Sequence, residues 1–262
     1  MRLTVIGCAG SVAGPHNPAS CYLVEADAGV GSETRTWSLL LDLGSGSVGP
    51  LQEVVDPATL DGILVSHGHP DHCADVASLS VLLRYGPAMG TGLAPIPLWG
   101  PAGIDERMRQ IEGASDDAGL APFAWSPIAP GETRALGPFT VTAARAWHPV
   151  PALAYRIEGP SESGGRAVLA FTGDTDMCDE VVASAANADL LLAEAGWAHR
   201  AENPPGIHLT GAQAGELARR AGAKRLVVTH VASWVDPAAT LTQARAEHAH
   251  AVLAASGVTF AI

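Results

Sequence analysis

Short apolar segments, separated by turns rich in Gly, Pro and Asn, dominate the hydrophobic pattern of the first half of the chain. Segments of this length between turn residues are typical of buried strands. The pattern predicts strands at Leu3–Gly7, Cys21–Glu25, Trp37–Asp42, Ile63–Ser66 and Ile96–Trp99. It also predicts a helix from Asp71 to Tyr85, ended by Gly86, and a short helix over Ile104–Ile111.

The second half of the chain shows the same mixture. Its apolar runs predict strands at Phe139–Arg145, Leu153–Glu158, Ala167–Thr172, Leu190–Glu194, Leu226–Thr229 and Val258–Ile262. A capping box at Thr210 and Gln213 begins one helix, and Asp236 followed by Pro237 begins a last helix that we expect to run to Gly257. Strands outnumber helices, and no linker interrupts the chain. The pattern therefore indicates one layered α/β domain over residues 1–262, with halves at about 1–120 and 121–262.

Composition narrows the functional classes. The chain has 15 Lys and Arg against 27 Asp and Glu, a formal net charge of −12, which argues against charge-driven binding of long nucleic acids. The 47% apolar content excludes intrinsic disorder. No apolar run approaches the about 18 residues of a membrane span. The four cysteines are scattered without a C-x-x-C pair, so we expect free thiols and a cytoplasmic location.

A dense histidine string follows the predicted strand Ile63–Ser66. It reads His67-Gly68-His69-Pro70-Asp71-His72 and holds three of the ten histidines within six residues. Imidazole and carboxylate groups are ligands for Zn²⁺, Mn²⁺ or Fe, and a loop between a strand and a helix lets alternate side chains converge. The string therefore predicts a metal site.

This string resembles the signature of the metallo-β-lactamase superfamily. Later segments resemble further motifs of the family in the same order along the chain: Leu41-Asp42-Leu43-Gly44, Trp147-His148-Pro149, Phe171-Thr172-Gly173-Asp174-Thr175 and Val228-Thr229-His230. The resemblance covers the whole chain. It implies an α/β fold of the family's type, a four-layer αββα sandwich.

The resemblance also implies two divalent metal ions per chain, zinc by preference, with Mn or Fe as alternatives. The implied ligands are His67, His69 and His148 for one ion, Asp71, His72 and His230 for the other, and Asp174 as a bridge between them. A water between two cations ionises near neutral pH and becomes a nucleophile. Asp42 is expected to be a structural hydrogen-bond acceptor that supports the metal loop.

Two further segments distinguish branches of the family. Leu192-Ala193-Glu194-Ala195 and Gly206-Ile207-His208-Leu209-Thr210 resemble the Glu and His motifs of the ribonuclease Z and cyclic-phosphodiesterase branch. This likeness makes Glu194 and His208 catalytic candidates beside Asp71, with His208 as the proton donor to a leaving oxygen. The long basic arm of the tRNA-processing enzymes is missing, because only residues 155–170 separate Ala154 from Phe171. Cleavage of precursor tRNA is therefore not expected.

The resemblance implies a binuclear phosphodiesterase, and we expect it to act on a small cyclic nucleotide. Its N-terminal Gly7-Cys8-Ala9-Gly10-Ser11 segment resembles actinobacterial-type enzymes of this class. Three alternatives stay open: a ribonuclease Z-like endonuclease, a carboxylic ester, thioester or lactone hydrolase, and a non-catalytic metal-binding scaffold, which the complete ligand set disfavours. The branch often forms homodimers, so a homodimer is expected by resemblance only.

Several side chains near the motifs have no assigned role. His16 and His199 are expected in loops. Trp197 and Trp234 could each either stack on a base or pack in the core, and the sequence leaves both alternatives open. His248 and His250 are expected on a solvated face of the last helix.

Overall fold

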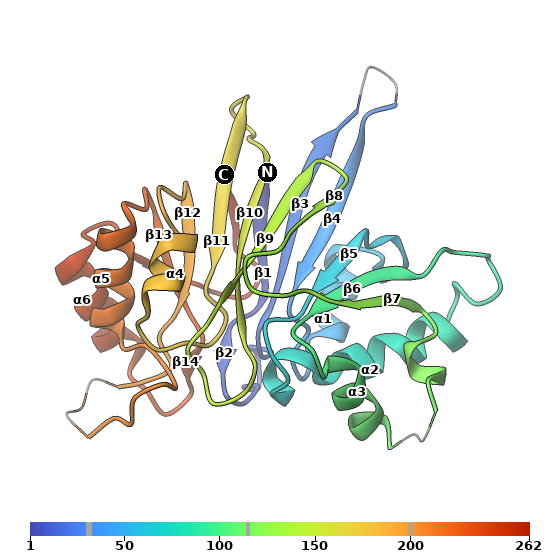
Figure 1. Ribbon diagram of the computed structural model, residues 1–262, viewed down its shortest axis with the longest axis horizontal. Coiled ribbons are helices and arrows are strands. Elements are labelled where there is room, and N and C mark those ends of the chain that lie inside the picture. The colour runs from blue at the N-terminus through green and yellow to red at the C-terminus, as the bar shows by residue number, and fades with distance from the viewer. Residues whose placement is uncertain (30–32, 114–115, 199, 201) are drawn as a thin grey trace.

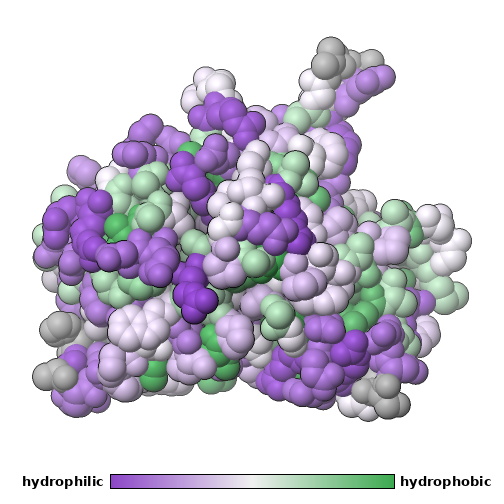
Figure 2. All heavy atoms as spheres, in the orientation of Figure 1, coloured by the Kyte–Doolittle hydropathy of each residue, from purple (hydrophilic) through white to green (hydrophobic). Residues whose placement is uncertain are grey.

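The architecture is that of two face-to-face sheets with helices on both outer faces (Figure 1). It comes from a computed structural model that describes residues 1–29, 33–113, 116–198, 200 and 202–262. The predicted αββα sandwich is confirmed. Figure 2 shows hydrophilic residues over α5 and α6 on the left and over α3 at the lower right, consistent with helices whose outer faces meet solvent.

The first sheet has the strand order β16-β1-β3-β4-β5-β6-β7. Its strands are β1 (Arg2–Gly7), β3 (Cys21–Ala28), β4 (Arg35–Leu41), β5 (Gly62–Leu64), β6 (Ile96–Gly100), β7 (Phe123–Pro127) and β16 (Thr259–Ala261). From β4 to β7 the pairing is parallel, and the remaining pairs are antiparallel. The helices of this half are α1 (Val48–Val54), α2 (Pro70–Tyr85) and α3 (Ile104–Glu112).

The second sheet has the order β15-β13-β12-β11-β10-β9-β8. Its strands are β8 (Thr133–Leu136), β9 (Phe139–Arg145), β10 (Leu153–Pro160), β11 (Arg166–Phe171), β12 (Leu190–Glu194), β13 (Leu226–Thr229) and β15 (Val252–Leu253). The helices are α4 (Asp179–Ser184), α5 (Gly211–Ala221) and α6 (Pro237–Glu247). A small parallel pair, β2 (Ala9–Gly10) with β14 (Val231–Ala232), joins the two halves near the site.

Burial follows the periods expected of each element. In β9, Phe139, Val141 and Ala143 alternate with half-buried residues and belong to the core between the sheets. In α5, Ala214, Leu217 and Ala218 recur at helical spacing and pack beneath the helix in a second apolar cluster. Each sheet thus packs on two apolar layers, one between the two sheets and one between the sheet and its helices.

The last helix is shorter than the sequence predicts. It ends at Glu247 rather than Gly257, because the backbone at His248 leaves the helical region and Val252 pairs with Val227 as part of β15. His248 Nε2 donates to the carbonyl of Ala223 at 3.1 Å, so the expectation that His248 lies on a solvated helix face is wrong. His250 also lies outside the helix.

Candidate metal centre and active site

The predicted site residues converge where strands of both sheets end. His67 and His72 follow β5, Asp174 follows β11, and His230 directly follows β13. The loop after β9 adds His148, two residues beyond Ala146. Since side chains at the ends of neighbouring strands meet at one edge of a sheet, residues far apart in sequence are brought together here.

One group of four ligand atoms can hold a metal ion: His67 Nε2, His69 Nδ1, His148 Nε2 and an oxygen of Asp174. His69 Nδ1 lies 3.0 Å from His67 Nε2 and 3.1 Å from His148 Nε2. Asp174 Oδ2 lies 3.7 Å from His67 Nε2. Ligands about 2.0–2.1 Å from a tetrahedral zinc ion are about 3.3 Å apart, so this spacing suits such an ion.

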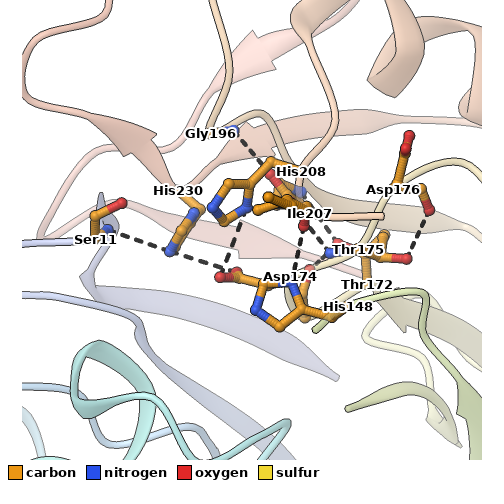
Figure 3. A network of polar contacts seen from close by, with 12 residues as sticks. Ser11, His148, Thr172, Asp174, Thr175, Asp176, Gly196, Ile207, His208 and His230 are labelled. Atoms are coloured by element: carbon orange, nitrogen blue, oxygen red, sulfur yellow. Dashed lines mark hydrogen bonds and ion pairs between the residues drawn. The ribbon is translucent and has the colours of Figure 1, made fainter. Parts of the chain in front are cut away.

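A second group consists of Asp71, His72, His230 and again Asp174. His230 Nε2 lies 3.1 Å from His72 Nε2 and 3.1 Å from Asp71 Oδ2. Asp174 Oδ1 lies 3.2 Å from His72 Nε2, on the side away from the first group. Figure 3 shows the Asp174 carboxylate between His148 and His230. The two groups, which we call the metal-ligand cluster, therefore share one carboxylate.

Hydrogen bonds behind the cluster fix its imidazole tautomers. His72 Nδ1 donates to Asp42 Oδ2 at 2.7 Å, and His148 Nδ1 donates to the Ile207 carbonyl at 2.8 Å. In the neutral form of each ring the lone pair is then on Nε2, directed into the cluster, which is the arrangement of metal-binding histidines. Among the described residues, the buried Asp174 Oδ1 has no hydrogen-bond partner. These donors fit the divalent ions that the resemblance implies.

Asp42 has the structural role expected of it. Besides His72, it accepts from the backbone N–H of Ser66 at 2.6 Å and from the Ser66 hydroxyl at 2.8 Å. Its φ of 57° is left-handed, and a Cβ on Gly44 would lie 1.9 Å from the Asp71 carbonyl. The turn after β4 thus packs its backbone directly on the first turn of α2 and supports the metal loop.

The backbone of His230 is constrained in the same way. Its φ of 56° is rare for a residue with a side chain. The N–H of His230 donates to the Cys8 carbonyl at 3.1 Å, and a Cβ on Gly10 would lie 2.2 Å from the His230 carbonyl oxygen. The β2–β14 pair holds this conformation, so the N-terminal segment positions the last ligand.

Electrostatics in the cluster favours charged carboxylates and couples metal binding to protons. Burial opposes ionisation of Asp174, but His230 and His72 outweigh it and hold the pKa of Asp174 well below its usual range. Burial lowers the pKa of His148 to about 4, so this ring is a neutral ligand at pH 7. Burial likewise opposes a charge on His72, yet Asp174 and Asp42 raise the pKa of His72 well above its usual range. Metal binding must displace that proton.

The structure also places Glu194 and His208, the pair predicted from the two branch motifs, beside the cluster. His208 Nδ1 donates to Glu194 Oε1 at 2.9 Å and lies 3.7 Å from Asp174 Oδ2. Glu194 is buried and accepts two backbone N–H bonds, from Thr175 at 2.9 Å and Gly196 at 2.7 Å. Burial opposes a charge on His208, but Glu194 and Asp174 outweigh it and raise the pKa of His208 to about 9. His208 is therefore protonated at neutral pH in this site.

Sequence reasoning missed two residues that position His208. A Cβ on Gly196 would lie 3.0–3.2 Å from atoms of the His208 ring, so the ring packs directly on the glycine backbone. The Trp197 ring meets the imidazole edge-on, at 5.5 Å between centroids and 76° between planes. We call Glu194, Gly196 and Trp197 the His208 socket. A glycine next to a buried motif residue at a strand end is the signal that could have indicated this close approach.

The side chains to which the sequence assigned no role differ in exposure and surroundings. Trp234 is 67% exposed, so a core role for it is wrong, whereas Trp197 is half-buried against His208. His16 is exposed, and His199 lies outside the described residues. Within the described part of the chain, none of the helices is both long and apolar enough to cross a membrane.

Comparison with known proteins places the chain among metal-dependent hydrolases. Residues 32–231 match the family described as Beta-lactamase superfamily domain. An uncharacterized protein of Mycobacterium tuberculosis is 37% identical over 94% of this chain and 86% of its own length. The crystal structure of YhfI, a metallo-beta-lactamase fold protein of Bacillus subtilis, matches with a TM-score of 0.81 and 28% identity over 99% of this chain and 98% of YhfI. A ribonuclease Z of Myxococcus xanthus is 26% identical over 95% of this chain and 93% of its own.

Proposed function

Because the chain belongs to the metallo-β-lactamase superfamily and is a metallo-hydrolase related to ribonuclease Z, we propose that it is a phosphodiesterase acting on a small cyclic nucleotide. The observation that carries the proposal is the position of His208, whose Nδ1 lies 2.9 Å from Glu194 Oε1 and 3.7 Å from Asp174 Oδ2, and these two carboxylates favour its cationic form by raising the pKa of His208. A cationic donor at this position suits the cleavage of an ester whose leaving group is a poorly stabilised alkoxide.

We assign one divalent ion to His67, His69, His148 and Asp174, and a second to Asp71, His72, His230 and Asp174. Nitrogen and oxygen donors of this kind suit zinc, and also Mn or Fe. When bound, such a pair supplies Lewis acidity toward the phosphate and lowers the pKa of the attacking water.

The side chains of the protein provide the remaining steps. Burial opposes ionisation of Asp71, but His230 and His72 lower the pKa of this carboxylate, which then accepts a hydrogen bond from the attacking water. His208 keeps its Nδ1 proton, which is hydrogen-bonded to Glu194, and donates its Nε2 proton to the leaving ribose oxygen. The P–O bond breaks as the new one forms, the proton released by the attacking water passes to Asp71 and on to solvent, and His208 is reprotonated from solvent. The product is a nucleoside monophosphate.

Two features favour a small substrate over RNA. The net charge of −12 provides no general attraction for a polyanion. The resemblance implies that a tRNA-processing enzyme would carry a basic arm between β10 and β11. Here that connection consists only of residues 161–165, which leaves no room for such an arm. The ribonuclease Z-like reaction and carboxylic ester, thioester or lactone hydrolysis are the competing assignments.

A substrate panel on metal-reconstituted protein tests the proposal. It comprises 3′,5′- and 2′,3′-cyclic nucleotides, bis-p-nitrophenyl phosphate, precursor tRNA, a lactone and a thioester. We expect cyclic nucleotides to be turned over with the highest kcat/KM and precursor tRNA to remain intact with excess enzyme. Efficient 3′-trailer cleavage would establish the endonuclease instead, and turnover confined to the lactone or thioester would overturn phosphodiesterase activity.

A further inference from the structure

A pocket of about 560 Å³ meets the metal-ligand cluster at one of its ligands, His148. His148 lines it, and the pocket continues along the segment Pro149–Leu153 toward Ala102. A second hollow shares four lining residues with this pocket and reaches His69: Pro101, Ala102, Val150 and Pro151. A substrate whose phosphate lies at the cluster can therefore extend its other end into this pocket.

The walls of the pocket are apolar and rigid. Prolines provide much of the lining, together with Val150: Pro101, Pro127, Pro130, Pro149 and Pro151. Because the proline ring fixes φ, these walls change shape little on binding. A preformed, mainly apolar pocket of this size with few polar groups is typical of a small-molecule site. A flat ring with two apolar faces suits such walls better than a hydrated sugar or phosphate does.

The pocket offers one uncommitted charge. Arg145 lines it and is exposed, and across the described ranges no side-chain hydrogen bond or ion pair of Arg145 is found. The other charged group, Glu132, is already engaged by Arg134 Nε at 2.7 Å and by the N–H of Ala129 at 3.0 Å. A free guanidinium is planar and stacks on aromatic rings. A single such cation can recognise one base but offers no track for a polynucleotide.

We propose that this pocket, which we call the Pro149–Pro151 pocket, binds the nucleobase of the substrate, and that Arg145 and Val150 determine its specificity. The assignment rests on the proposed function for the class of ligand. It adds the position of the base: on the His148 side of the cluster, with one face on the proline walls and Arg145 over the other.

Binding of adenosine tests the pocket without any turnover, since adenosine has no phosphate. Calorimetry on metal-reconstituted protein should show adenosine binding to the wild type and a Kd raised at least about tenfold by Val150→Trp, which fills the pocket. The matched control is Ala88→Trp, which places the same bulk in a separate pocket of about 580 Å³ remote from the cluster, and it should leave the Kd unchanged. Arg145→Gln, a surface change that does not disturb packing, should raise the Kd of adenosine by about threefold or more.

Two results would overturn the inference: no adenosine binding to the wild type at millimolar concentration, or equal binding to the wild type and the soluble, folded Val150→Trp and Arg145→Gln variants. Hexanoate serves as the competing probe. If hexanoate binds, is lost in Val150→Trp, and adenosine does not bind, the pocket holds an acyl chain. Failure of the proposed function is separate, because it appears as absent hydrolysis of cyclic nucleotides whatever adenosine does.

Discussion

The metal-ligand cluster and the His208 socket lie side by side, but they are held in place differently. The cluster draws one ligand set from α2 and its preceding loop and another from the ends of β9, β11 and β13, so it depends on both sheets. Its ligand atoms face one another closely enough to share an ion, and the buried Asp174 Oδ1 has no hydrogen-bond partner among the described residues. In the socket, by contrast, Glu194 is satisfied by His208 and two backbone N–H groups. The cluster has the donor set of an ion site, whereas the Glu194 carboxylate of the socket already has its hydrogen bonds from the protein.

Asp174→Ala should produce the largest effect, because this carboxylate faces both ligand groups. We expect loss of at least one equivalent of metal and a fall in turnover beyond the about 10²–10⁴-fold typical of losing a general acid. Elemental analysis of protein reconstituted without chelator measures the metal. The control is Asp179→Ala, which removes an exposed carboxylate paired with Arg220 and should keep two equivalents. A variant of Asp174 that retained both ions would refute the bridging assignment.

His208→Ala should separate the two regions. Both metals should stay, because His208 is outside the seven ligands, while kcat on a cyclic nucleotide falls by about 10²–10⁴-fold. The loss should shrink on a p-nitrophenyl ester, whose leaving group is already stable as an anion. Steady-state kinetics on the two esters, with metal analysis in parallel, gives the answer. An equal loss on both would assign His208 to phosphate binding and remove the proton-donor role.

Glu194→Gln should give a smaller defect with a pH signature. The Glu194 carboxylate helps raise the pKa of His208 to about 9, and the acid must be protonated to act. Removing that negative charge lowers the pKa of His208, so the alkaline fall of kcat should move to lower pH while activity near pH 6 is affected less. The pH dependence of kcat measures this shift. Glu247→Gln, which alters an exposed carboxylate paired with Arg219, should leave the profile in place. If the alkaline fall of kcat stayed at the same pH in Glu194→Gln, Glu194 would not be what raises the pKa of His208.

The sequence allowed the cluster to be predicted better than the socket for a physical reason. The string His67–His72 stands out among apolar strands because of its distinctive chemistry, and His148, Asp174 and His230 are identified through the resemblance of their segments to family motifs. The socket works through backbone proximity at Gly196 and ring packing at Trp197, and a single glycine or tryptophan is a much weaker signal in the sequence than a histidine string.

The same limit explains the errors in the fold. The short helix α4 and the edge strand β8 have too few residues for a clear period, so they were not predicted. α1 and β7 were not predicted either. The last helix was predicted too long because the alanine-rich stretch after Glu247 has helical propensity, and pairing of Val252 with Val227 overrides it.

Gly196→Ala should give the smallest effect and tests whether the socket matters at all. The added Cβ would lie 3.0–3.2 Å from the His208 ring, closer than ordinary contact, so the ring must shift by a few tenths of an ångström. Since Glu194 still holds Nδ1, we expect both metals to remain and kcat to fall by about tenfold, with KM little changed. Gly49→Ala is the matched control, because Gly49 has open space around its Cβ position in α1, and there alanine should preserve kcat and raise stability by about 0.5–1 kcal/mol. If Gly196→Ala turned over as fast as Gly49→Ala, the imidazole would tolerate displacement, and the Glu194 hydrogen bond alone would position it.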